Sequence, residues 1–335
     1  MDSPEDQVFR LIIGYRAARL VALAAELGIA DQLADGPKTA AALAETVGVH
    51  TGSLERCLHG LCALGVFTQD EEGRFGLTPL SSCLMSGQWA HAQARMALEE
   101  GYSSWAELAH TVRTGKPAYE LVHGLPRWQH LATMPDASER FNAAMAASAR
   151  LDGQALLKSC EFSGVSSVVD VGGGRGALMA AILTAHPDMY GTILDLASGL
   201  EGAAAELDAA GVANRCRLVT GSFFDNVPAG GDRYILRWVL HDWDDERALQ
   251  VLRVCAQAMP SHARLFVIER LMPERFKPTA ADLRLVMADL HMMVILGGRE
   301  RTEAEFRHLL HAAGLRLTRR APLAMGTWVL EASQS

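Results

Sequence analysis

Short apolar runs alternate with segments of helical length through the second half of the chain. Runs rich in Val, Ile and Leu are typical of buried parallel strands, and the longer segments between them favour helices. The pattern predicts strands at residues 165–171, 191–195, 216–220, 233–240 and 264–269, and helices at 177–185, 200–210, 246–258 and 303–313. This alternation indicates an α/β fold with a doubly wound parallel sheet and right-handed crossovers. Residues 315–318 and 327–331 are expected to add an antiparallel pair at the sheet edge.

The first hundred residues show a different pattern, in which helices precede a β-hairpin. Residues 11–27 are rich in Ala and Leu and predict an apolar helix with a spare face for another subunit. Shorter helices are expected at residues 39–47 and 53–64, and Gly65 is typical of a helix end. Residues 66–78 carry two short apolar runs around a polar turn, which predicts the hairpin. This order of elements indicates a mostly helical, winged-helix-like module.

Charge argues against a nucleic-acid partner for that module. Residues 1–100 contain 7 Lys and Arg against 13 Asp and Glu, and the whole chain has a net charge of −8. Binding to nucleic acid depends on several cationic contacts with phosphates, and the segment that would be the recognition helix offers only Arg56 and His59. Packing and dimerisation are therefore the expected role of residues 1–100. An anionic membrane surface is excluded on the same ground.

Composition is typical of a globular protein of the cytoplasm. Hydrophobic residues make up 49% of the 335 residues, which allows a large core. The most apolar N-terminal run, residues 11–30, contains Arg16, Arg19 and Glu26, so it is neither a signal peptide nor a membrane span. The six cysteines show no CxxC or metal-ligand spacing. A reducing cytoplasm and the absence of a metal site are therefore expected.

Residues 168–176 join a predicted strand to a predicted helix through a glycine-rich turn. Gly172 and Gly174 can adopt positive φ and expose bare backbone, so that a ligand can lie against the turn. The third glycine of a dinucleotide fingerprint is replaced by Ala177, and no phosphate-binding Gly-Lys-Ser/Thr follows. A nucleoside-type cofactor is the remaining interpretation. Asp195 ends the next strand and is placed to accept hydrogen bonds from ribose hydroxyls.

Three polar clusters follow later strands at the same edge of the predicted sheet. Ser222 is placed to bind an adenine edge and Phe223 to stack on its face. His241 follows a strand and precedes a helix start that Asp244 or Asp245 can cap, so that capping does not need the histidine. With an ordinary pKa near ~6.5, a histidine can accept a proton at neutral pH. Glu269 or Glu300 could orient the imidazole, as the third member of a triad does.

At this point the sequence resembles the S-adenosylmethionine-dependent small-molecule O-methyltransferases, the class of plant caffeate and hydroxyindole enzymes and of bacterial antibiotic-pathway enzymes. Nearly the whole chain shares the likeness, and three motifs carry it. They are residues 170–174 (Asp-Val-Gly-Gly-Gly), 237–243 (Arg-Trp-Val-Leu-His-Asp-Trp) and 297–303 (Gly-Gly-Arg-Glu-Arg-Thr-Glu). The resemblance implies a Rossmann-like methyltransferase sheet, S-adenosylmethionine as cofactor, and an intertwined homodimer.

The resemblance also implies a division of the chain and a role for each site residue. The expected parts are a dimerisation domain at residues 1–100, a helical connector over the acceptor pocket at 101–160, and a cofactor-binding domain at 161–335. The implied cofactor-binding residues are Asp170, Gly172, Gly174, Asp195, Ser222, Phe223 and Arg237. Ser222 departs from the Asp that is common at its position. His241 matches the catalytic base, flanked by Glu269 and Glu300, and the family requires no metal.

The expected reaction is methylation of a phenolic hydroxyl on an aromatic small molecule, in bacterial secondary metabolism. Adaptable Met and aromatic side chains suit a flat acceptor. The candidates for its pocket are Trp105, Met145, Trp238, Asp242, His291 and Met292. Methylation of carbon or nitrogen on the same scaffold is an alternative. A winged-helix regulator that senses the cofactor is a third interpretation, which the acidic N-terminal half disfavours.

Overall fold

The computed structural model describes residues 3–323 and 326–335, with the backbone alone described for residues 97–100. The chain divides into two compact units, Met1–Tyr102 and Ser103–Ser335. The division of the second unit into a connector at 101–160 and a cofactor-binding domain at 161–335 stays a prediction. No helix in the described ranges combines the length and apolar character needed to span a membrane.

The first unit consists of helices with one hairpin. Its elements are α1 (Pro4–Glu26), α2 (Ile29–Gln32), α3 (Ala40–Val47), α4 (Thr51–Ala63), β1 (Phe67–Gln69), β2 (Phe75–Leu77), α5 (Pro79–Ser82) and the first part of α6 (Trp89–Ala106). The strands β1 and β2 pair antiparallel, so the predicted hairpin is confirmed. Gly65 adopts φ 73° just after α4, as the sequence predicted for a helix end.

The first helix is longer than its apolar pattern predicts. It begins at Pro4 rather than at residue 11, because Ser3 and Asp6 form a capping box ahead of the apolar segment. The added turns carry the exposed apolar side chains Val8 and Phe9, and Leu11, the first residue of the predicted helix, is 82% exposed. The other end of α1 packs through Ala24 against the core of the unit. One helix therefore has a buried end and an uncovered apolar end.

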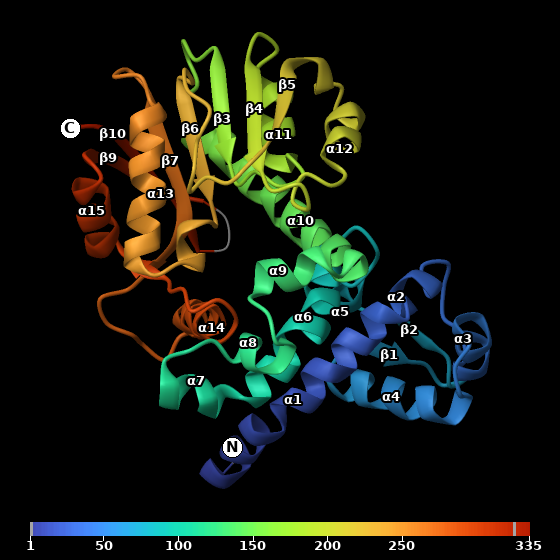
Figure 1. Ribbon diagram of the computed structural model, residues 1–335. Helices are drawn as coiled ribbons and strands as arrows, with labels where there is room; N and C mark the ends of the chain where they lie inside the picture. The colour runs from blue at the N-terminus through green and yellow to red at the C-terminus, as the bar shows by residue number, and fades with distance from the viewer. Residues whose placement is uncertain (1–2, 324–325) are drawn as a thin grey trace. The chain divides into compact units, whose positions relative to one another are not determined.

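Helices precede the sheet in the second unit, and the order of elements follows the predicted α/β pattern (Figure 1). The leading helices are α7 (Leu108–Thr114), α8 (Ala118–His123), α9 (Arg127–Ala132) and α10 (Pro135–Ser159). The strands are β3 (Ser167–Val171), β4 (Tyr190–Asp195), β5 (Cys216–Thr220), β6 (Arg233–Arg237), β7 (Arg264–Met272), β8 (Arg301–Thr302), β9 (Leu315–Pro322) and β10 (Thr327–Gln334). The remaining helices are α11 (Ala177–Ala185), α12 (Ala203–Ala209), η1 (Ala213–Arg215), η2 (Leu240–Asp242), α13 (Asp245–Ala258), α14 (Ala280–Ile295) and α15 (Glu303–Ala312).

The strand order is β5-β4-β3-β6-β7-β10-β9, with β8 paired to β7. Strands β3 to β7 are parallel, and β10 pairs antiparallel with both β7 and β9. The predicted parallel sheet and its antiparallel pair are therefore confirmed. Because β3 lies at the point where the order reverses, the loop after it opens at the position where such sheets bind ligands.

Alternate residues of the central strands pack on opposite faces of the sheet. Val169 and Leu236 belong to the apolar core that includes residues of α13 and α15. Val168 and Ile235 belong to the core that includes residues of α10 and α11. Burial of both faces explains why these strands read as continuous apolar runs. Figure 1 shows α13 in front of the sheet and α11 behind it.

One predicted boundary is wrong in a way that matters for the site. The apolar pattern predicts a strand at residues 233–240, but β6 ends at Arg237. Trp238 adopts φ 54°, and it is the single non-glycine residue with positive φ in the described ranges. Residues 240–242 then form the short helix η2. A strained residue in this position costs about 1–3 kcal/mol and persists only where its surroundings enforce it.

Candidate active site

The turn after β6 is held by a carboxylate from the neighbouring strand. Trp238 donates its backbone N–H to the carbonyl of Ile268, 3.0 Å away, which is the last regular contact of β6 with β7. Glu269 then presents Oε1 to the next three amides, at 3.0 Å from Val239 N, 2.9 Å from Leu240 N and 3.4 Å from His241 N. If β6 continued, these amides would bond the backbone of a neighbouring strand. Here the carboxylate accepts their hydrogen bonds instead. Glu269 thus folds the backbone at His241.

A different acid holds the imidazole ring. His241 is 4% exposed, and its Nδ1 lies 3.0 Å from Glu300 Oε1. Glu269 Oε2 lies 3.5 Å from the same nitrogen, and Asp242 Oδ1 lies 3.4 Å from Nε2. An ionised carboxylate can only accept, so Nδ1 carries the hydrogen in the bond to Glu300. In the neutral ring Nε2 therefore holds the lone pair and is the basic atom.

The charges around His241 favour its protonated form. Burial alone would lower the pKa of His241, but the carboxylates of Glu269 and Glu300 outweigh burial and raise it to about 9. Burial raises the pKa of Glu269 to about 7 and that of Asp242 to about 6. For Glu300 the attraction of His241 and Arg270 overcomes burial, and its pKa is lowered. Glu300 is therefore the acid that is ionised beside the ring.

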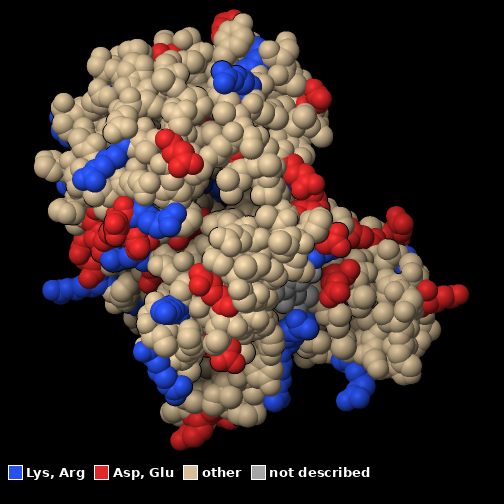
Figure 2. Space-filling model, in the orientation of Figure 1, with Lys and Arg blue, Asp and Glu red and all other residues tan. Residues whose placement is uncertain are grey.

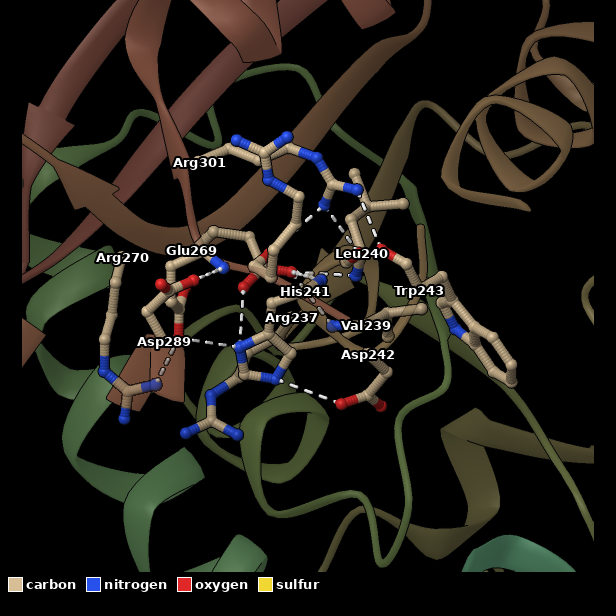
Figure 3. A network of polar contacts seen from close by, with 12 residues as sticks. Arg237, Val239, Leu240, His241, Asp242, Trp243, Glu269, Arg270, Asp289 and Arg301 are labelled. Atoms are coloured by element: carbon tan, nitrogen blue, oxygen red, sulfur yellow. Dashed lines mark hydrogen bonds and ion pairs between the residues drawn. The ribbon is translucent and has the colours of Figure 1, made fainter. Parts of the chain in front are cut away.

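Residues 298–301 clamp the backbone of the His241 turn (Figure 3). Gly298 lies so close to the carbonyl of His241 that a Cβ has no space, and Arg299 donates its N–H to that carbonyl at 2.9 Å. Arg301 is fully buried and donates to the carbonyls of Leu240 and Trp243, each at 2.8 Å. The pairing of β8 with β7 brings this segment to the turn.

Two arginines of the site, Arg270 and Arg301, were not predicted from the sequence. Arg270 donates to Glu300 Oε1 at 3.0 Å, opposite the imidazole. Arg301 also bonds Asp245, while Asp244 caps α13. Alternation along β7 predicts residues 269 and 270 on opposite faces, so the sequence offers no reason to expect Arg270 in the same site as Glu269. Burial of Arg301 had no signal in the sequence, because an arginine in a polar stretch is usually exposed.

The glycine turn after β3 makes a cradle of bare backbone. Gly172 has φ 77°, and a Cβ on it would lie 2.8 Å from Val239 and 3.6 Å from the Phe223 ring. Gly174 has φ 53° and donates its N–H to Asp195 Oδ2 at 2.8 Å. Leu196 N donates to Asp195 Oδ1 at 2.7 Å, which completes the anchoring of this carboxylate. The predicted neighbours Gly172, Gly174, Asp195 and Phe223 are therefore brought together.

Two other predicted cofactor residues lie beneath this turn. Asp170 is buried, its Oδ2 has no hydrogen-bond partner within the described ranges, and burial raises its pKa to about 7. Arg237 bonds Asp152 Oδ2 and Ser148 Oγ of α10, both at 2.8 Å. Asp170 thus lies against Gly173 of the turn, and Arg237 is anchored to α10.

Ser222 and Phe223 begin the loop after β5. The Ser222 Oγ accepts a hydrogen bond from Phe224 N at 3.2 Å, which leaves its own hydrogen to donate elsewhere. The Phe223 ring packs 5.0 Å from that of Phe224 and 6.4 Å from that of Trp243. Trp243 is part of the motif at residues 237–243, but it was not predicted to be a site residue. The structure places it in this aromatic group.

The predicted acceptor residues fall into separate places. Trp105 donates from Nε1 to His291 Nδ1 at 3.2 Å. Trp238 lies between two guanidinium groups, with Arg237 4.4 Å and Arg270 4.2 Å from its ring centre, and its ring is 6.1 Å from that of His241. Asp242 adjoins His241, as described above. Met145 on α10 and Met292 on α14 are half-buried.

Comparison with known proteins identifies the family. Residues 105–316 match the O-methyltransferase domain, and residues 9–87 match the O-methyltransferase dimerisation domain. The chain belongs to this O-methyltransferase family. It is an S-adenosylmethionine-dependent O-methyltransferase with a Rossmann-like sheet, as the motifs predicted.

Relatives of this O-methyltransferase resemble it over most of their length. It is 40% identical over 327 residues to the phenazine O-methyltransferase PhzM of Lysobacter antibioticus, which covers 97% of this chain and 95% of that protein. The crystal structure of LaPhzM superposes with a TM-score of 0.94 at 39% identity and covers 100% of both chains. A second solved structure is that of the O-methyltransferase NcsB1 of neocarzinostatin biosynthesis, crystallised with S-adenosylmethionine and 2-hydroxy-5-methyl naphthoic acid. It superposes with a TM-score of 0.80 at 36% identity and covers 95% of this chain and 96% of that chain.

The cradle of this O-methyltransferase fits the adenosyl part of S-adenosylmethionine. At Gly172 a side chain would fill the space beside Phe223, whereas bare backbone leaves room for a ligand. Asp195 is half-buried at the strand end, where its oxygens can accept from ribose hydroxyls in addition to the two backbone amides. Gly172, Asp195, Ser222 and Phe223 are the residues that would hold the group.

One set of buried donors resembles a metal site in composition. His241, Glu269 and Glu300 each offer an atom within 4.8 Å of the others. Glu300 Oε1 is already engaged, because it accepts from both Arg270 and the imidazole Nδ1, whereas Glu269 Oε2 and Glu300 Oε2 have no hydrogen-bond partner within the described ranges. A guanidinium bonded to the same oxygen repels a divalent cation. The arrangement therefore favours a protonated imidazole over a bound metal ion.

Proposed function

We propose that the enzyme methylates a phenolic hydroxyl of an aromatic small molecule and that His241 is the general base. The observation that carries this proposal is the hydrogen bond from His241 Nδ1 to Glu300, which leaves Nε2 as the basic atom. NcsB1 was crystallised with a hydroxylated naphthoic acid, and PhzM is named for a phenazine, so flat aromatic acceptors are the expected class. Relatives of this kind belong to bacterial secondary metabolism.

The raised pKa of His241 suits the removal of a proton from a phenol. A phenol has a pKa near ~10, so proton transfer to an ordinary histidine of pKa ~6.5 is uphill by roughly 5 kcal/mol. With the pKa of His241 raised to about 9, the same transfer is uphill by only about 1 kcal/mol. The carboxylates that raise this pKa also stabilise the imidazolium as it forms.

The chain supplies base and alignment, and the cofactor supplies the methyl group that the phenolic oxygen takes up as its proton passes to Nε2. General-base assistance of this kind contributes roughly 10²–10⁴ in rate. Holding the reacting oxygen in line contributes further, because orientation is part of the barrier that enzymes remove. Asp242, 3.4 Å from Nε2, lies where it can receive a hydrogen bond from the imidazolium.

The proposal is tested by product analysis with methyl-labelled S-adenosylmethionine and a panel of phenols and anilines with the same ring systems. Mass spectrometry with fragmentation locates the label on oxygen, nitrogen or ring carbon. Label on phenolic oxygen for at least one acceptor class is the expected result. Label only on nitrogen or carbon would replace the proposal with the alternative methyltransferase activity.

We also propose that the functional unit is a homodimer and that nucleic acid is not a partner. The dimerisation domain at residues 9–87 and the exposed apolar end of α1 support the first statement. Acidic and basic side chains are interspersed on the face shown in Figure 2, where Lys and Arg form no continuous surface. Light scattering after size exclusion tests the dimer, and a fluorescence DNA-binding titration tests the regulator interpretation.

A further inference from the structure

Trp105 and His291 form a hydrogen-bonded pair whose members lie 186 positions apart in the sequence. The indole Nε1 lies 3.2 Å from His291 Nδ1. An indole nitrogen can only donate, so His291 Nδ1 must accept and cannot carry a hydrogen. The hydrogen of the neutral imidazole is then on Nε2. His291 is fixed as a donor through Nε2, which is the opposite tautomer from that of His241.

The surroundings of His291 keep it neutral. Burial lowers the pKa of His291 to about 4, and the positive charges of Arg127, His241 and Arg270 act in the same direction. The ring therefore does not titrate across the physiological range. An uncharged donor among three cations suits an oxygen that carries partial or full negative charge.

Hydrogen bonds connect the helix of His291 directly to the base. Asp289, two residues earlier on α14, accepts from the backbone N–H of Glu300 at 2.8 Å. Glu300 in turn holds His241 Nδ1. Trp105 packs at the edge of the small core formed by Ala118, Tyr119, Val294 and Ile295, which fixes the partner of His291 as well. His291 is thus rigidly placed beside the site rather than on a mobile surface.

The second nitrogen of His291 is unused. In the described ranges no hydrogen bond to Nε2 is present, and the side chain is only half-buried. Because the ring is partly exposed, its Nε2 hydrogen can be given to water or to a bound ligand. This donor is therefore available to a ligand group that arrives from outside the chain.

We propose that His291 donates its Nε2 hydrogen to an oxygen of the acceptor and so selects aromatic acceptors that bear a carboxylate or carbonyl in addition to the reacting hydroxyl. This inference rests on the proposed methylation of phenolic oxygen and specifies its substrate class. A bound acceptor that covers the His291 ring displaces water from it, so an analogue without the matching oxygen is disfavoured because it leaves the Nε2 donor unpaired.

The test compares hydroxynaphthoates that differ in carboxylate position with the naphthols that lack the carboxylate. Wild-type kcat/KM for the best hydroxynaphthoate is expected to exceed that of its naphthol by roughly 10- to 100-fold, as for a hydrogen bond to a charged group. His291→Leu should reduce this preference to within about threefold while naphthol turnover is retained. His291→Gln, which keeps a donor, should restore part of the preference. A preference unchanged in His291→Leu would overturn the inference.

Two further measurements separate this inference from the function on which it rests. Trp105→Phe removes the donor that sets the tautomer and should also reduce the preference, whereas His308→Asn changes an exposed histidine on α15 and should leave it unchanged. Calorimetric titration of hydroxynaphthoate and naphthol, with S-adenosylhomocysteine present, measures the same preference without turnover. Binding preference without any methylation would refute the proposed reaction alone, and equal binding of both would refute the role of His291 alone.

Discussion

Glu269 binds the backbone of His241, and it does so from a strand 28 residues away in sequence. Its Oε1 accepts from the amides of residues 239–241, while the imidazole ring is held by Glu300. The two acids that flank His241 are therefore not equivalent. Glu269 sets the backbone position of His241, Glu300 sets its tautomer, and both carboxylates raise its pKa.

Replacing His241 by Gln should abolish most turnover and leave cofactor binding intact. The amide keeps the approximate shape of the side chain but cannot take a proton at neutral pH. We expect kcat to fall by roughly 10²–10⁴. Steady-state rates from labelled cofactor, together with the calorimetric Kd for S-adenosylhomocysteine, measure the two effects. Turnover like that of the wild type would remove His241 from the role of base.

The pH dependence of kcat/KM should show an ascending limb that ends near pH 9. The neutral ring is the base, and the pKa of His241 is raised to about 9, so the active fraction grows roughly tenfold per pH unit below that value. In Glu300→Gln the main ionised partner of the imidazole is gone. The limb should then move to lower pH, with a smaller maximal rate because the base is weaker. A limb in the same place in both proteins would contradict the assignment of Glu300.

Gly298→Ala should destabilise the protein and slow it, because no space exists for a Cβ beside the carbonyl of His241. Displacement of a packed backbone costs about 1–3 kcal/mol. Gly14→Ala is the matched control, since nothing lies within 4 Å of its Cβ position and Gly14 is within α1. Alanine in a helix should stabilise that variant by up to about 1 kcal/mol. Urea denaturation of both variants measures the difference.

Arg301→Lys should lose the clamp on the turn although it keeps the charge. A lysine ammonium cannot bond the carbonyls of Leu240 and Trp243 and the Asp245 carboxylate in the geometry of the guanidinium fork. Because Arg301 is fully buried, we expect a loss of about 3–5 kcal/mol in the free energy of unfolding. The kcat of the folded fraction should also fall, with KM for the cofactor little changed. Arg307→Lys, at an exposed position on α15, is the control.

Asp195→Asn should weaken cofactor binding with little effect on the rate at saturating cofactor. The carboxylate accepts from Gly174 N and Leu196 N and is placed to accept from ribose hydroxyls as well. Loss of a hydrogen bond to a charged group costs about 1.5–3 kcal/mol, or roughly 10- to 100-fold in Kd. Calorimetry with S-adenosylhomocysteine measures this change. An unchanged Kd would contradict the ribose assignment.

Much of the fold could be predicted because it depends on local periodicity and on short motifs. The strands of residues 167–171 and 264–272 follow apolar runs, and the order of strands and helices indicated the parallel sheet. His241, Glu269, Glu300 and Asp195 could be chosen because each lies in a motif or at a strand end. The end of β6 could not be predicted, because residues 238–240 are as apolar as the strand that precedes them and a carboxylate from β7 turns them away.

The sequence by itself determined the class of fold and the cofactor and supplied His241 as the proposed base, since these are encoded in residue order and in motifs of a few residues. Tertiary structure alone decided which acid holds the ring and which holds the backbone, how Arg270 and Arg301 are buried, and that Trp105 meets His291. Each of these relationships joins positions far apart in the chain. Such contacts depend on how the whole sheet and its helices pack, and the local sequence pattern therefore does not predict them.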